Sequence, residues 1–425
     1  TLDRSSAASD VYKRQLLGML LHAVQHLAYG YSLDRIIGPE TFLQGVEGAS
    51  DSRRLAVLML CGLVAGCGWW LIYRFGRPLI SVTQAVQDPA ARMPAKTTLA
   101  HALLQIITVG LGSPLGREVA PREVGALAAS GVSAWLRLPA DQHRLIVACG
   151  AGAGLAAVYN VPLGAALFVL EVLLGTFAWP AAAVALVTCC IGAVIAWIGL
   201  GNEIQYAVPP MTAGASLIVW AAVAGPLFGI AAQGFVQLTS AARRQAARGW
   251  RLPVAAFVNF TLIGVLAIFL PALLGNGKGP AQLGFSSELT LGMAALLLVL
   301  KVAITSGSLR AGASGGLLTP GIAIGALLAV VLGAAWNLIW PNAPPGAYAV
   351  VGAAAFLAAS MRMPLTAIVL ILEFTRVDQA FLVPIILAVG GSVATQRWCA
   401  ARAAPPPDNS PARDDQTARP SRTPT

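Results

Sequence analysis

Residues 150–171 read GAGAGLAAVYNVPLGAALFVLE, and residues 352–373 read GAAAFLAASMRMPLTAIVLILE. Without a gap, half of the aligned positions are identical, among them a proline and the final glutamate. A second matching pair, residues 116–129 and 316–329, precedes the first in the same order and at nearly the same offset. Two ungapped matches in one order rarely arise by chance, so we interpret the chain as an internal duplication.

The composition indicates a membrane protein. Of the 425 residues, 57% are hydrophobic and 11% are charged, and the mean hydropathy is +0.72. A soluble chain carries about 25% charged residues. Apolar segments recur from Leu55 to Trp398, many long enough to supply the roughly 20 residues that cross a hydrocarbon core. We therefore predict an all-α integral membrane protein with several spans.

The net charge of +10 is concentrated at segment ends and in the tails. This distribution suits cytoplasmic loops that face anionic lipid, and it argues against nucleic acid as a partner. We expect a multi-pass protein of a bacterial inner membrane with cytoplasmic termini.

The duplication predicts two related halves, at roughly residues 55–200 and 215–398. In transporters such halves are often inverted about an axis in the membrane plane, and the substrate site lies where their interrupted helices meet. Glu171 and Glu373 occupy equivalent places near apparent segment ends. We interpret both as structural, either capping a helix or pairing with a nearby base.

The two ends of the chain differ from the part between them. Residues 1–15 are polar, and we predict a non-native or disordered segment there. Residues 16–402 form the predicted anion-permeation domain. Residues 403–425 are rich in proline, arginine and aspartate, which is typical of a disordered tail. No soluble regulatory domain is expected.

Glycine and proline cluster at four breaks in the apolar segments. The breaks lie at residues 110–121, 159–162, 312–321 and 361–364. Each precedes a further apolar helix, whose first backbone N–H groups are free and lie at the positive end of the helix dipole. A membrane tolerates irregular backbone only where it is buried or lines a watery cavity. The breaks therefore predict an anion site without lysine, although glycines that merely allow close helix packing remain an alternative.

Glu118 lies directly at one of these breaks, beside Arg117. An ionisable side chain at such depth is costly and usually functional. A carboxylate at a helix N-terminus can occupy an anion site as a tethered competitor that protonation releases, so Glu118 is a candidate pH-dependent gate. The alternative is structural pairing of Arg117 with Glu118 or of Arg122 with Glu123.

In these motifs the sequence resembles the CLC family of chloride channels and proton–chloride exchangers, over residues 16–398. Gly116, Arg117 and Glu118 match the start of the family's G-[KR]-E-G-P motif. Its glutamate is the external gate, so the resemblance assigns the gate to Glu118. The two residues that follow are Val-Ala instead of Gly-Pro.

Residues 316–320, GLLTP, resemble the family's G-x-F-x-P motif, whose backbone amides bind the central anion. The resemblance implies that the amides of Leu317 and Leu318 do so here, with Leu318 in place of the motif's phenylalanine. The residues assigned to backbone anion binding are Gly116, Arg117, Gly316, Leu317, Leu318, Thr319 and Pro320.

Several positions depart from the family pattern. The family's G-S-G-I-P loop corresponds to RFGRP at residues 74–78, so Phe75 replaces an anion-coordinating serine. The predicted pore-lining residues of this loop are Phe75, Gly76, Arg77 and Pro78. The pore tyrosine has no counterpart, because no tyrosine follows Tyr348.

The inner proton-carrying glutamate of the exchangers is also missing. Residues 167–172 read LFVLEV, which puts Val172 at that position, as in the family's channels. His101 stands where the family usually has a lysine, with Lys301 as its mate in the repeat.

The resemblance implies a homodimer with one pore per subunit, conducting chloride or a similar small anion, gated by Glu118 and coupled weakly or not at all to protons. One alternative is a proton-coupled exchanger for chloride, fluoride or nitrate that uses another inner acid. A non-conducting membrane scaffold is another. An intramembrane enzyme is disfavoured, because the four histidines form no H-E-x-x-H. We expect no cofactor and no metal site.

Overall fold

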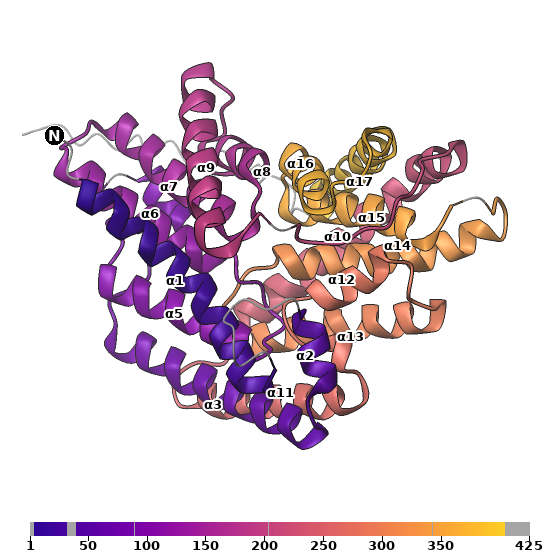
Figure 1. Ribbon diagram of the computed structural model, residues 1–425, viewed down its shortest axis with the longest axis horizontal. Helices are drawn as coiled ribbons and strands as arrows, with labels where there is room; N and C mark the ends of the chain where they lie inside the picture. Colours follow the sequence, from indigo (N-terminus) through magenta and orange to yellow (C-terminus); the bar gives the residue numbers. More distant parts are fainter. Residues whose placement is uncertain (1–3, 32–39, 89, 203, 342, 404–425) are drawn as a thin grey trace, which may run out of the picture.

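The fold is built almost entirely from helices (Figure 1). The computed structural model describes residues 4–31, 40–88, 90–202, 204–341 and 343–403. Within these ranges, seven helices are long and apolar enough to cross a membrane. The predicted all-α membrane fold is confirmed.

The helices of the two halves correspond to one another in order along the chain. The first pairs are α3 (Asp51–Phe75) with α11 (Arg251–Phe269), α4 (Val82–Gln87) with α12 (Lys278–Phe285), α5 (Ala95–Gly110) with α13 (Leu291–Arg310), and α6 (Val119–Trp135) with α14 (Leu318–Asn337). The remaining pairs are α7 (Ala140–Tyr159) with α15 (Pro345–Met361), α8 (Pro162–Phe168) and its π-helical extension η1 (Val169–Leu174) with α16 (Pro364–Thr375), and α9 (Trp179–Leu200) with α17 (Leu382–Ala403). The other helices are α1 (Arg4–Tyr29), α2 (Phe42–Gly48), α10 (Ala215–Arg244), η2 (Pro271–Leu273) and η3 (Gln379–Phe381).

The two halves lie side by side and also interlock. Figure 1 shows α5–α9 on one side of the molecule and α12–α17 on the other. The equivalent helices α3 and α11 pack against each other, and α10 packs along α17.

The same helix break is built twice. Helices α7 and α15 each end at a left-handed residue, Asn160 and Arg362, both with φ 56°. A proline then occupies the first turn of the next helix, at Pro162 and Pro364. Proline cannot continue the preceding helix, but its fixed φ suits a first helical position. The breaks predicted at residues 159–162 and 361–364 are therefore present.

Each half caps a broken helix of the other. The Glu373 carboxylate of α16 accepts hydrogen bonds from the backbone N–H groups of Leu163 (3.0 Å) and Gly164 (2.7 Å) at the start of α8. The Glu171 carboxylate accepts from two N–H groups in the first turn of α16 in the same way, at 3.1 and 2.8 Å. These contacts confirm the predicted capping role. Reciprocity of this kind is what a two-fold axis between related halves produces.

The ends of the described chain are helical. Helix α1 begins at Arg4, so residues 4–15 have a helical backbone where the sequence predicted a non-native or disordered start. That they are foreign to the fold stays a prediction. Helix α17 ends at Ala403, and the rest of the predicted tail, residues 404–425, lies outside the described residues.

We expect Glu373→Gln to lower the free energy of unfolding by about 1–3 kcal/mol, because a charged acceptor of two backbone donors is replaced by a neutral amide. Thermal unfolding of the detergent-solubilised protein measures this as a lower melting temperature. Glu47→Gln, which removes the same charge from an exposed position, is the control. Equal melting temperatures for the two variants would contradict the capping role.

Candidate functional site

The segments before α6 and α14 meet through their backbones. The N–H of Gly116 donates to the carbonyl of Gly316 (2.8 Å), and the N–H of Gly316 donates to the carbonyl of Gly116 (3.0 Å). This antiparallel bridge brings together two stretches that are far apart in sequence. Because both helices begin just after it, the positive ends of two helix dipoles lie at one place.

The Glu118 carboxylate lies against this bridge and is 1% exposed. Its Oε1 accepts a hydrogen bond from the backbone N–H of Leu318 at 2.8 Å, at the start of α14. A Cβ atom on either Gly116 or Gly316 would overlap the carboxylate. Both glycines are therefore needed for the carboxylate to approach the backbone so closely.

A hydroxyl chain holds the other carboxylate oxygen. The Tyr159 hydroxyl donates to Glu118 Oε2 at 3.3 Å, and it lies 2.9 Å from the Thr319 hydroxyl. Since Tyr159 has a single O–H proton and directs it to Glu118, Thr319 must be the donor to Tyr159. The hydrogen bond from Tyr159 to Glu118 was not among the predictions from the sequence. The available signal was its place in a break whose repeat mate is the apolar Met361.

The guanidinium groups of the two arginines near Glu118 each lie over an aromatic ring. The Arg117 guanidinium lies 5.3 Å from the centre of the Tyr159 ring, and that of Arg122 lies 5.0 Å from the centre of the Phe168 ring. In the part of the chain that the structure describes, neither arginine forms an ion pair with its neighbouring glutamate. The alternative of structural Arg117–Glu118 or Arg122–Glu123 pairs is therefore wrong.

Glu123 instead contacts His101. Its Oε2 lies 3.0 Å from His101 Nδ1, and both residues are buried, at 8% and 4% exposure. Gln105 donates to the same carboxylate at 3.3 Å. The other ring nitrogen, Nε2, lies 3.2 Å from the Ser314 hydroxyl, two residues before Gly316. The His101–Glu123 pair thus links α5, α6 and the segment that leads into the bridge.

The remaining predicted site residues lie in different surroundings. In the loop after α3, the Arg77 N–H donates to Thr97 Oγ1 (3.2 Å) at the start of α5, and the Phe75 side chain is 74% exposed. Its ring packs edge-on against Trp70, with 6.3 Å between centroids. Val172 lies in η1 and packs against the apolar core. That residues 75–78 line a pore stays a prediction.

Comparisons with known proteins place this geometry in a family. The sequence model described as "Voltage gated chloride channel" matches residues 36–397. The chain is 31% identical over 340 residues to a "Putative chloride channel protein ClcB-like" of Ralstonia nicotianae, covering 78% of each chain. It is 30% identical over 303 residues to an "H(+)/Cl(-) exchange transporter ClcA" of Cronobacter sakazakii, covering 68% of this chain and 64% of that one.

Solved structures agree on the fold. A slow cyanobacterial Cl−/H+ antiporter superposes with a TM-score of 0.76 at 19% identity, over 94% of this chain and 96% of the antiporter. The residues matched by the family model include both breaks that build the Glu118 site. The chain therefore belongs to the voltage gated chloride channel family, the CLC proteins.

Proposed function

We propose that the protein conducts chloride or a similar small anion across the membrane, through a pore that the Glu118 carboxylate gates. The observation that carries the proposal is the 2.8 Å hydrogen bond from the Leu318 N–H to Glu118 Oε1. A negatively charged group already occupies the place where two helix N-termini meet. Partial charges at such a site bind an anion weakly enough for it to leave again.

The gate works by competition. The ionised carboxylate and a free anion need the same backbone donor, so the anion cannot bind while Glu118 is docked. Protonation removes the negative charge and weakens the hydrogen bond from Leu318, because charge-assisted hydrogen bonds are roughly twice as strong as neutral ones. Conduction should therefore increase as the pH falls.

Val172 supports weak proton coupling, since no carboxylate stands at the position of the inner proton carrier. Proton-coupled exchange is the second candidate, and the buried His101–Glu123 contact favours it. This pair lies beside the bridge, so its carboxyl group offers an inner acid in place of the missing one. The matched relatives carry both names, channel and exchanger.

The assembly and orientation extend the proposal. We infer a homodimer in a bacterial inner membrane, with cytoplasmic termini. The bacterial relatives and the basic residues at the segment ends support it.

We expect Glu118→Gln to abolish the pH dependence of anion flux, because glutamine keeps the size of the side chain but cannot ionise. Chloride efflux from liposomes should rise on acidification in the wild type. In the variant it should be independent of pH and, at neutral pH, about tenfold higher. A variant that keeps the wild-type pH profile would refute the gate. Absence of flux of any anion through either protein would favour a non-conducting scaffold.

Tyr159→Phe should move the midpoint of the flux–pH curve to higher pH by up to about one unit, because one hydrogen bond to the docked carboxylate is lost. Tyr348→Phe is a matched control, since the hydroxyl of this tyrosine donates to Asn337 Oδ1 at 2.7 Å, at the opposite end of α14 from Leu318. The role of Tyr159 is excluded if the two variants share the wild-type midpoint.

The two candidate functions differ in proton movement. Under an imposed chloride gradient, the leading proposal predicts little proton uptake relative to chloride flux in wild-type liposomes. The opposite outcome is stoichiometric proton uptake in the wild type. If Glu123→Gln abolished this uptake but kept chloride flux, and the exposed-site control Glu47→Gln behaved like the wild type, exchange through the His101–Glu123 pair would be established. Uncoupled conduction would then be overturned.

A further inference from the structure

A cavity of about 250 Å³ lies where α15 ends and α16 begins, against the side of α17. Its lining contains Arg362, Arg397 and Gln396, and the other lining residues are alanine, valine and proline. No aspartate or glutamate is among the described residues that line it. The cavity is therefore positively charged and partly apolar.

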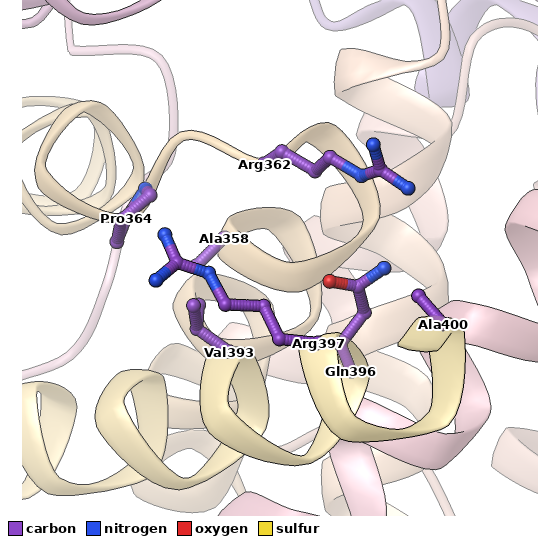
Figure 2. Close-up of a pocket in the computed structure, with 7 residues that line it drawn as sticks. All are labelled: Ala358, Arg362, Pro364, Val393, Gln396, Arg397 and Ala400. Carbon is purple, nitrogen blue, oxygen red and sulfur yellow. The ribbon is translucent and has the colours of Figure 1, made fainter. Parts of the chain in front are cut away.

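Figure 2 shows the polar side chains of this cavity: Arg362 extends from the turn before α16, and Arg397 extends from α17 toward Pro364. The two guanidinium groups point to opposite sides, and the Gln396 amide lies on the side of Arg362. In the described part of the chain, neither arginine takes part in an ion pair. Gln396 is 2% exposed, and its Nε2 donates to Gln233 Oε1 on α10 at 2.8 Å, which holds the amide in the cavity wall. Two guanidinium groups, on opposite sides, and one fixed amide thus belong to the lining of this cavity.

Arg362 lies at a turn with a left-handed backbone. The residue has a left-handed conformation with φ 56°, which glycine and asparagine adopt far more readily than arginine. The equivalent position in the first half is Asn160, with the same φ of 56°. Arg137 and Arg376 also have positive φ values, 52° and 47°, so the backbone conformation fixes where the Arg362 side chain starts and the cavity lining carries the argument for its role.

The equivalent corner of the first half is closed by side chains. There, Trp197 on α9 donates from Nε1 to Asn160 Oδ1 at 2.7 Å, and Asn160 Nδ2 donates to Asn202 Oδ1 at 2.7 Å. In the second half, α17 presents Val393 and Ala400 toward the turn, and the cavity remains. The duplicated scaffold thus differs at this corner by a cavity with arginines in its wall.

The position in the membrane suggests the ligand. One turn beyond the cavity, the Arg402 guanidinium stacks 3.7 Å from the centre of the Trp398 ring. Tryptophan and basic residues at the end of a spanning helix mark the headgroup level. Guanidinium groups bind phosphate through paired N–H donors, and the apolar wall suits the carbon chain attached to it. We propose that this cavity binds a phosphate group, either that of an anionic lipid or free phosphate.

The test uses the full chain, purified in detergent and stripped of lipid. Native mass spectrometry measures retention of phosphatidylglycerol and of phosphatidylcholine, whose phosphate lies beside a cation. A second arm measures the melting temperature with inorganic phosphate in place of lipid. The variants are Arg362→Asn, which introduces the residue of the first half into the same turn, and Arg397→Gln. Arg402→Gln, on the same helix outside the cavity, is the control.

We expect the wild type and Arg402→Gln to retain phosphatidylglycerol in preference to phosphatidylcholine, and each cavity variant to bind it about tenfold more weakly. A second outcome would also support the site: inorganic phosphate stabilises the wild type but neither cavity variant, and the wild type shows no preference between the two lipids. This result would identify a soluble ligand. Equal retention of the two lipids by the wild type with no effect of phosphate would overturn the proposal. So would cavity variants that bind like the control.

Discussion

The backbone bridge between Gly116 and Gly316 is the contact on which the remaining geometry depends. Two N–H···O bonds hold the starts of α6 and α14 together, and the absence of a Cβ atom on both residues leaves room for one carboxylate. In a low-dielectric interior an unpaired backbone N–H is costly, so the donors at the two helix starts need a partner. Glu118 supplies it through Leu318. A free anion at this place would have to satisfy the same donor, so in the proposed function Glu118 and the anion compete for one site.

The scaffold contacts are equivalent in the two halves, whereas the residues at the candidate site differ between them. Glu171 and Glu373 cap each other's half in the same way. At the functional positions the two halves differ. The repeat mate of Glu118 is Leu318, so the carboxylate accepts its hydrogen bond from the backbone of its own symmetry-related residue.

One cluster of buried polar side chains lies beside the bridge. The carboxylate of Glu123 and the imidazole of His101 are nearly inaccessible, and a group of this kind inside a membrane protein is expensive and usually functional. The repeat mate of His101, Lys301, is fully buried and donates to backbone carbonyls, among them that of Leu273 at 3.4 Å. One half thus has a titratable pair beside the bridge, and the other half has a lysine held by backbone oxygens. Equivalent helices of the two halves therefore carry different polar groups.

The amino-acid sequence alone determined the membrane environment, the duplication and the four helix breaks. These follow from local properties: the length of the apolar runs, the identity of aligned positions, and the inability of proline and clustered glycine to continue a helix. Glu118 could also be predicted as a candidate site residue, because a carboxylate at a break within an apolar segment stands out in the sequence itself.

Only the tertiary structure decided which side chains face one another. Arg122 and Glu123 are neighbours in sequence, yet the arginine stacks on Phe168 and the glutamate contacts His101, because successive residues of a helix point in different directions. Tyr159 meets Thr319 across 160 positions of the chain, and Arg362 and Arg397 line one cavity only because α15 and α17 pack together. Such contacts depend on how helices cross, and no local pattern of residues encodes a crossing.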